Sequence, residues 1–441
     1  MQPGPFPEDL PRAEIDRLQA DGLTNLLAAI LPRHGFYRRK FAAAGLLDQP
    51  LSFPGDLPRI PFTTKAELVA AQQERPPHGE LLSVPFDWCT RMHQTSGTAG
   101  KPLRWYDTLE SWSGLLDVWQ SLLRIVGVRH DDHLFFPFSF GPFLGFWSAF
   151  EAGVRYGCLC LPGGAMTSTA RLRFLFDHAV TVVFCTPTYA LHLMEVAARE
   201  KVDLASSPVR ALIVAGEPGG SVPGTRGRIE AGWGARVFDH NGMTETGPLG
   251  IECPEAPGGL HLLESVCWPE VIDPASGDPV PPGTSGELVV TTFRRTAAPL
   301  IRYRTGDLVC VDPRPCRCGR ALIRLDGGIR GRVDDMVIVR GNNVHPAAVQ
   351  TILHRFPEVA EYTVEIDEAG TLVDLKVHVE AVPDCDARAL CERIDRAIRD
   401  ELFFRAAVVP AAPGALPRPE LKARRWHRKT AGGAAIRPAG P

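Results

Sequence analysis

The sequence predicts an α/β protein with a large N-terminal domain and a small, mobile α+β domain after it. Three observations support this fold class. The chain has 441 residues, more than one hydrophobic core usually organises. Short apolar runs alternate with helix-like segments between about residues 105 and 245, and such units bury parallel strands under helices. A shorter set of mixed segments follows residue 334. We expect domains at residues 1–333 and 334–431, and a flexible tail at 432–441.

The parallel part of the first domain is expected from its apolar runs. Strands are predicted at residues 181–185, 211–215 and 236–239, and helices at residues 189–201 and 220–232. Ligands gather at the carboxyl ends of such strands. Residues 216–218 and 241–242 are therefore expected at a binding site.

The pattern changes from about residue 260 to residue 311, where short alternating segments are separated by Pro and Gly turns. This predicts mixed sheets, with an antiparallel, barrel-like subdomain that completes the large domain. In the small domain, strands are predicted at residues 336–339, 361–366 and 372–379, and helices at residues 346–355 and 386–402.

Composition narrows the classes of partner. The formal net charge is -3, from 48 basic and 51 acidic residues, so there is no broad attraction to nucleic acid or to an anionic membrane. The most apolar stretch, residues 134–154, is interrupted by prolines and glycines, and the N-terminus lacks the pattern of a secretory signal. A cytoplasmic location is expected, and eleven cysteines in such a chain suggest free thiols or a metal rather than a disulfide scaffold.

Four short segments carry the chemistry. The loop TSGTAGK at residues 95–101 combines glycines, hydroxyls and a lysine that can meet phosphate oxygens, although alone it also fits a surface turn. The run GMTE at residues 242–245 follows an apolar strand and offers a hydroxyl and a carboxylate, which suits Mg²⁺. The other two are YRTGD at residues 303–307 and a hinge-like segment at residues 331–346.

In this order and at these separations, the segments resemble the adenylate-forming superfamily of acyl-CoA ligases, and most closely its phenylacetate-CoA ligase branch. The match runs from about residue 36 to residue 422. The resemblance implies that ATP, Mg²⁺ and coenzyme A bind, and that the small domain rotates about Asp334 between two orientations. It places Gly341 in the channel for the pantetheine arm of coenzyme A.

The resemblance also assigns the nucleotide site by position. Thr244 is expected at the α-phosphate, Glu245 at Mg²⁺, Asp307 at the ribose hydroxyls and Arg332 between ribose and phosphate. The β- and γ-phosphates are assigned to Thr95, Ser96, Gly97, Thr98, Gly100 and Lys101, and the adenine to the segment residues Gly216, Glu217, Pro218, Asp239, Asn241 and Gly242. Asn241 departs from the family, which usually has an aromatic residue there to stack on adenine. Base selectivity is therefore less determined than phosphate binding.

Two lysines are candidates for the cation that stabilises charge during adenylation. Lys422 resembles the lysine that the family's C-terminal segment carries into the site, although the surrounding arginines also fit a solvated basic tail. Lys65, in PFTTKAEL, is either a second active-site cation or a helix-start residue.

Aromatic residues are concentrated between residues 135 and 147, which suits a flat apolar acid but also fits core packing. By resemblance, the walls of the acid pocket are Phe138, Phe140, Gly141, Phe143 and Ala215. His240, Asn241 and Ser139 could bond to ring substituents.

A compact thiol pair, Cys316 and Cys318, can join Cys253 and His261 from an upstream loop. Three sulfurs and one imidazole complete a tetrahedral zinc site, and several members of the branch resemble this arrangement. Reduced cysteines without metal are the alternative. The expected zinc is structural.

Together these patterns predict an ATP-dependent ligase for an aromatic acid of the phenylacetate, benzoate or anthranilate type. Transfer of the acyl group to an acyl carrier protein or to a small amine or alcohol is the alternative acceptor chemistry. A non-catalytic sensor of nucleotide or aryl acid is the alternative of another class, and a homodimer is left open.

Overall fold

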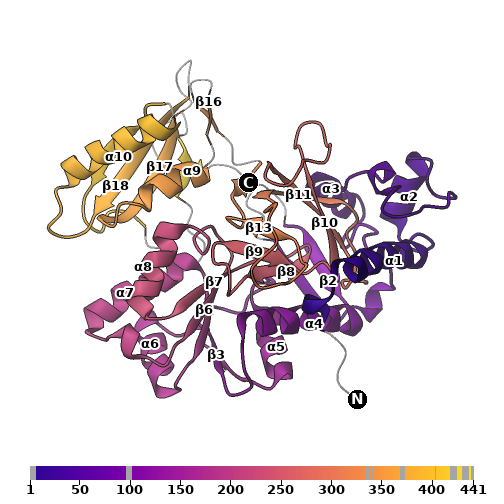
Figure 1. Ribbon diagram of the computed structural model, residues 1–441, viewed down its shortest axis with the longest axis horizontal. Helices are drawn as coiled ribbons and strands as arrows, with labels where there is room; N and C mark the ends of the chain where they lie inside the picture. The colour runs from indigo at the N-terminus through magenta and orange to yellow at the C-terminus, as the bar shows by residue number, and fades with distance from the viewer. Residues whose placement is uncertain are drawn as a thin grey trace.

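The computed structural model describes residues 6–95, 102–333, 337–339, 342–344, 346–367, 373–402, 404–417, 425–429 and 437–438. The helices are α1 Arg12–Ile30, α2 Gly35–Ala43, α3 Lys65–Glu74, α4 Leu109–Val126, α5 Trp147–Tyr156, α6 Ser168–Asp177, α7 Pro187–Glu200, α8 Pro223–Trp233, α9 Pro346–Leu353 and α10 Ala387–Leu402. Figure 1 shows a large body formed by the first eight of them and a smaller one formed around α9 and α10.

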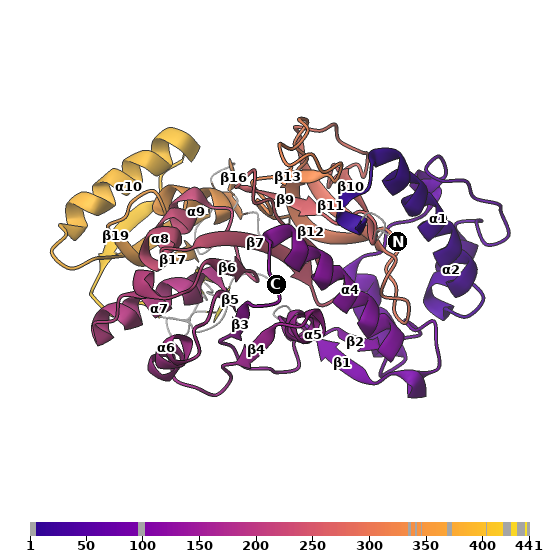
Figure 2. The ribbon, with the colours of Figure 1, turned by 60° about the horizontal axis from the view of Figure 1, so that its bottom comes forward.

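The centre of the large body is a mixed eight-stranded sheet in the order β13-β9-β8-β7-β6-β5-β3-β4. Its strands are β3 His133–Phe136, β4 Leu159–Pro162, β5 Val182–Cys185, β6 Ala211–Val214, β7 Arg236–Met243, β8 Gly247–Glu252, β9 Gly259–Leu262 and β13 Arg324–Asp326. The run β4-β3-β5-β6-β7 is parallel, and antiparallel pairing begins between β7 and β8. The predicted alternation of strands and helices is confirmed here, with α7 and α8 between β5, β6 and β7 (Figure 2).

The central parallel strands β5 and β6 are buried on both faces because their residues are apolar on both. All four residues of β5 and of β6 are buried, as expected for strands covered by helices. One face packs against α4, which starts at its cap Thr108, whose hydroxyl accepts from the amide of Ser111, and ends at Gly127 in the left-handed conformation, φ +77°. This pairing of a hydroxyl cap with a C-terminal glycine is a common way to bound a helix.

A second sheet lies beside the first and is antiparallel. Its order is β10-β11-β12-β14, with β10 Cys267–Ile272, β11 Ser285–Thr292, β12 Tyr303–Cys310 and β14 Gly331–Arg332. Antiparallel pairing is as expected, but the described strands form an open sheet rather than a closed barrel. A two-stranded sheet of β1 Arg91–Gln94 and β2 Arg104–Asp107 is antiparallel, so residues 95–103 connect two paired strands.

The small body has a five-stranded sheet in the order β19-β18-β17-β20-β21 and a two-stranded sheet of β15 and β16. The strands are β15 Val337–Val339, β16 Asn342–Val344, β17 Val359–Asp367, β18 Asp374–Ala381, β19 Ala407–Ala411, β20 Trp426–Arg428 and β21 Arg437–Pro438. Its own apolar core includes Val364, Val377 and Ile394. Within the described part of the chain, no helix combines the length and apolar character needed to cross a bilayer.

Candidate active site

The candidate site lies where the parallel strands end and the chain turns back into antiparallel pairing. A turn after β7 carries Thr244 and Glu245, and the carboxylate of Glu245 is almost fully buried. The Nζ atom of Lys65 lies 3.4 Å from Oε1 of Glu245, and the hydroxyl of Tyr303 lies 3.5 Å from the same oxygen. Burial, reinforced by Glu245, raises the pKa of Tyr303 well above its ordinary value, so this phenol stays a donor to the carboxylate.

Lys65 reaches this position because it is the first residue of α3. The hydroxyl of Thr64 accepts from the amide of Glu67, and the carboxylate of Glu67 accepts from the amide of Thr64, which completes a capping box. The two sequence interpretations of Lys65, helix start and neighbour of the active site, are therefore compatible. The side chain is half exposed, which leaves its ammonium accessible to an anionic ligand.

Asp307 and Arg332 occupy paired positions on β12 and β14. Their side chains form an ion pair of 3.0 Å. Gly306 has φ +78°, and a Cβ there would lie 2.7 Å from the guanidinium of Arg332, so the close approach requires glycine. Glu287 accepts from the amide of Gly306 at 3.1 Å and supports this turn. The structure thus brings together two residues that the sequence assigns to the ribose.

Of the phosphate loop, Thr95 is described. Its hydroxyl accepts from the amide of Leu103 at 3.0 Å, and its own amide donates to the carbonyl of Leu103 at 2.9 Å, so it closes the neck of the loop between β1 and β2. The remaining assigned residues lie outside the described part of the chain: Ser96, Gly97, Thr98, Gly100, Lys101, and also Asp334, Gly341 and Lys422.

The segment expected at the adenine follows β6. Gly216 is in the left-handed region at φ +94°. The carboxylate of Glu217 accepts from the amide of Thr188 at the start of α7, at 2.8 Å. Asp239 accepts from the hydroxyl of Ser221 at 2.6 Å, and burial, with the nearby Glu252 carboxylate, raises its pKa to about 7. These carboxylates brace the loop that contains Pro218.

Asn241 is buried, and its Oδ1 atom has no hydrogen-bond partner among the described residues. The side chain lies against β8, because a Cβ at Gly250 would sit 2.9 Å from Oδ1. Gly242, by contrast, is exposed. Position 241 therefore presents no aromatic ring on which a base could stack.

The predicted acid pocket is an aromatic network. The rings of Phe138 and Phe140 lie 4.7 Å apart, and Phe138 is 5.5 Å from Phe146. His240 joins the network through Trp119, at 4.4 Å, and Phe146, at 6.4 Å. Trp119 was not expected from the sequence, although the apolar stripe of a strongly amphipathic helix could have marked it. Phe146 lies in the aromatic stretch 135–147 but was not assigned to the pocket wall.

The remaining pocket residues are placed differently. Ala215 packs against the same cluster. The carbonyl of Gly141 accepts from the indole of Trp147 at 3.0 Å, so this glycine shapes the loop. Phe143 is 46% exposed and lies at the surface beside Gly141.

His240 has a defined protonation state in this network. Burial lowers its pKa to about 4, and its Nδ1 atom lies 2.7 Å from the carbonyl oxygen of Gly250. A neutral imidazole that contacts a carbonyl through Nδ1 must donate there, which leaves Nε2 as an acceptor. A Cβ at Gly242 would lie 3.3 Å from that Nε2, so the acceptor faces the start of the GMTE run.

The four predicted zinc ligands converge. Their ligand atoms all lie within 4.8 Å of one another. The Sγ atoms of Cys253 and Cys316 are 3.6 Å apart, and Sγ of Cys318 is 3.3 Å from Nε2 of His261. Zn–S bonds of about 2.3 Å at tetrahedral angles give S···S separations of about 3.8 Å, so the donor set has the size and chemistry of a structural zinc site.

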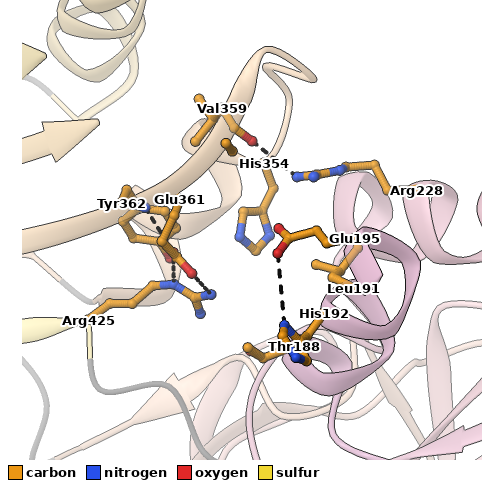
Figure 3. Close-up of a pocket in the computed structure, with 11 residues that line it drawn as sticks. Thr188, Leu191, His192, Glu195, Arg228, His354, Val359, Glu361, Tyr362 and Arg425 are labelled. Carbon is orange, nitrogen blue, oxygen red and sulfur yellow. Dashed lines mark hydrogen bonds and ion pairs between the residues drawn. The ribbon is translucent and has the colours of Figure 1, made fainter. Parts of the chain in front are cut away.

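The two bodies meet at a pocket between α7, α8 and the small domain. Figure 3 shows Thr188, His192 and Glu195 of α7 facing Glu361 and Tyr362 of β17 and Arg425. Helix α8 also contacts the small domain. Thr225 is hydrogen-bonded to Nδ1 of His354, and Arg228 donates to the carbonyl of Val359 at 3.3 Å. The contact fixes one orientation of the small domain.

Comparison with known proteins agrees with this geometry. The AMP-binding enzyme family matches residues 69–293, and the AMP-binding enzyme C-terminal domain matches residues 341–428. A phenylacetate-coenzyme A ligase of Thermus thermophilus is 34% identical over 436 residues, with 94% of this chain and 96% of that protein covered.

2-Hydroxyisobutyryl-CoA ligase has been solved in more than one state, and this chain can be compared with two of them. The TM-score is 0.91 for the postadenylation state, at 29% identity and with 96% of this chain and 92% of that chain covered. It is 0.73 for the thioesterification state, at 30% identity and with 97% and 94% covered. Since identity and coverage hardly differ, the small domain here is arranged as in the postadenylation state. The chain belongs to the AMP-binding enzymes and is an AMP-forming acid–CoA ligase of the phenylacetate-CoA ligase-like branch.

Proposed function

We propose that this ligase activates an aromatic carboxylic acid with ATP and transfers the acyl group to coenzyme A, with release of pyrophosphate and AMP. The observation that carries the proposal is the position of His240, two residues before Gly242 on β7 and 4.4 Å from the ring of Trp119. The aromatic network therefore reaches the segment that would hold the α-phosphate. A flat acid seated among these rings would present its carboxylate there.

The described residues suit the first half of this reaction. Glu245 offers a carboxylate for Mg²⁺, and Thr244 offers a hydroxyl to the α-phosphate. The acid's carboxylate oxygen attacks the α-phosphorus and pyrophosphate leaves. Lys65, beside Glu245, supplies positive charge close to the phosphates, and we assign the charge at the reacting carboxylate to Lys422.

In the second half, the thiol of coenzyme A attacks the acyl-AMP carbonyl, its proton is lost, and AMP leaves. The small domain must first rotate away from the orientation held by His354. We assign this rotation to Asp334 and the thiol channel to the neighbourhood of Gly341.

Within the aromatic acids, the pocket favours those that carry a hydroxyl or amino group on the ring. Because Nδ1 of the neutral His240 donates to Gly250, its Nε2 atom can accept a hydrogen bond from a ring substituent. A ring O–H or N–H that reaches this nitrogen gains a hydrogen bond inside a mostly apolar pocket, which adds affinity. Acids of the anthranilate and hydroxybenzoate type satisfy this condition.

We also propose that Cys253, His261, Cys316 and Cys318 hold a structural zinc. Cys253 follows β8 and His261 lies in β9 of the first sheet, whereas the other two lie between β12 and β13. A metal here ties together segments that are more than fifty residues apart. All four donors come from the protein, so the site has no open position for substrate.

The test is to incubate the protein with MgATP and a pool of benzoic, anthranilic, hydroxybenzoic and arylacetic acids, with and without coenzyme A. Mass spectrometry should detect one aryl-CoA together with AMP, and only acyl-AMP when coenzyme A is omitted. Acyl-AMP that does not respond to coenzyme A would contradict the assigned acceptor. Acyl-CoA formed only from aliphatic acids would contradict the aromatic substrate.

A further inference from the structure

The side chain of Arg295 is completely buried and touches the backbone of the Thr244–Glu245 turn from behind. Its Nη1 atom donates to the carbonyl of Glu245 at 3.1 Å and also to the carbonyl of Thr244. Its Nε and Nη2 atoms donate to the two carboxylate oxygens of Asp107, at 2.8 and 2.5 Å. Both side chains of this pair have 0% exposure.

We propose that Arg295 is a positioning residue for adenylation, which rests on the proposed function: with Asp107, it fixes the Thr244–Glu245 turn to the strand that leaves the phosphate loop. Asp107 is the last residue of β2, and β2 follows that loop directly. The Arg295–Asp107 pair, called the clamp below, therefore joins the two segments that would hold the triphosphate and its metal.

A stability role alone does not explain a pair of this kind. Removing two charges from water costs several kcal/mol, and buried ion pairs can often be replaced by apolar residues without loss of stability. What an apolar pair cannot do is hold two backbone carbonyls. Those bonds prevent rotation of the peptides after Thr244 and Glu245, and the carboxylate of Glu245 is then directed towards Lys65 and Tyr303.

The geometry is specific to arginine. Its planar guanidinium carries five N–H donors, so it can serve a carboxylate and two carbonyls together, whereas a lysine ammonium has three donors at one point. The guanidinium also lies 5.3 Å from the ring of Trp105. The carboxylate is fixed from the other side, because Ser111 of α4 donates to Asp107 at 2.9 Å.

The backbone that carries Arg295 is held as well. A Cβ at Gly114 would lie 2.5 Å from the carbonyl oxygen of Arg294, so α4 packs directly on this loop. The indole of Trp105 donates to the carbonyl of Ala298 at 3.2 Å. A displaced loop would therefore move the clamp and the turn together.

The test compares half-reactions in a double variant, Arg295→Met with Asp107→Leu, which removes both charges. The expected result is a melting temperature close to wild type and acyl-AMP formation slowed about 100-fold, the scale on which small misplacements act. The KM for the acid should change little, and more Mg²⁺ should be needed for half-maximal rate. Thioester formation from synthetic acyl-AMP and coenzyme A should stay near the wild-type rate.

The matched control is Arg210→Met with Asp132→Leu. Asp132 of this pair is also buried. Arg210 immediately precedes β6 and Asp132 immediately precedes β3, so the pair lies at the amino ends of the parallel strands, opposite the candidate site. Its removal should leave both half-reactions unchanged.

A folded double variant that adenylates at the wild-type rate would overturn the inference, as would equal loss of both half-reactions. If the double variant fails to fold, Arg295→Lys is measured in the same assays of the two half-reactions. This variant keeps the buried charge but loses the planar guanidinium that binds a carboxylate and two carbonyls together. The wild-type protein is assayed in parallel each time. If it forms no aryl-AMP, the proposed function is overturned, and this inference with it.

Discussion

Gly224 of α8 and His354 of the small domain meet so closely that a side chain could not be placed between them. A Cβ at Gly224 would lie 2.2 Å from the carbonyl oxygen of His354. The neighbouring Thr225 is hydrogen-bonded to Nδ1 of the same histidine. This contact belongs to the arrangement that resembles the postadenylation state, and the proposed rotation of the small domain would have to break it.

Gly224→Ala should therefore weaken this arrangement. Overpacking of a tight contact costs at least about 1 kcal/mol, and 1.4 kcal/mol shifts an equilibrium tenfold. We expect acyl-AMP formation to slow about tenfold while thioester formation from supplied acyl-AMP is unchanged or faster, measured by rapid quench. Gly227→Ala is the control on the same helix, because a Cβ there meets nothing within 4 Å. Equal effects of the two variants would show that the contact has no influence on the orientation.

Lys65→Met should lower activity without lowering stability. Lys65 is half exposed, and its ion pair with Glu245 is 3.4 Å long, so the pair contributes little to folding. In the site, the lost cation no longer screens the triphosphate. We expect the rate of pyrophosphate release to fall about tenfold or more and the melting temperature to stay within about 2 °C. Lys40→Met, which removes the partner of Glu67 on the far side of α3, should keep wild-type activity.

Replacement of one residue of the proposed zinc site should lower thermal stability. Structural zinc sites contribute folding free energy directly. Cys316→Ser should lose bound zinc, measured by plasma mass spectrometry, and its melting temperature should drop by several degrees. Cys385→Ser, in the small domain and away from the cluster, should keep one zinc per chain. Metal-free wild-type protein with an undiminished melting temperature would contradict the proposed site.

The parallel strands and the motifs could be recognised from the sequence, because the hydrophobic pattern of a strand and the composition of a motif are each contained in a short segment. The family resemblance assigned Glu245 and Asp307 to one nucleotide site, and it left Lys65 as either a second active-site cation or a helix-start residue. Contacts between residues far apart in the chain leave no signal in the sequence around either residue. Nothing near Arg295 points to Asp107, 188 residues away, and nothing near Gly224 points to His354. Such residues became functional candidates only when the packing of α4, α8 and the second sheet was known.

The buried His240 should make folding stability depend on pH. Its pKa falls from 6.5 to about 4 in the folded state because of burial. Between these values the unfolded chain binds a proton that the folded protein does not bind, so stability is present above pH 6.5 and is lost as the pH falls towards 4. The contribution is about 3 kcal/mol, at 1.36 kcal/mol per pKa unit. In urea titrations at several pH values, His240→Gln should flatten this dependence; an unchanged slope would assign it to other groups.

His240 should also decide which ring substituents the enzyme accepts. Replacement by phenylalanine keeps an aromatic ring beside Trp119 and Phe146 but removes the Nε2 acceptor. A lost hydrogen bond in a buried pocket costs about 1 to 3 kcal/mol. The ratio of kcat/KM for a hydroxyl- or amino-substituted acid to that for its unsubstituted parent should therefore fall about tenfold or more in His240→Phe. Phe143→Leu, a change at the exposed edge of the same loop region, should leave that ratio unchanged. If His240→Phe lowers both rates by the same factor, the histidine supports the pocket wall and makes no contact with the substituent.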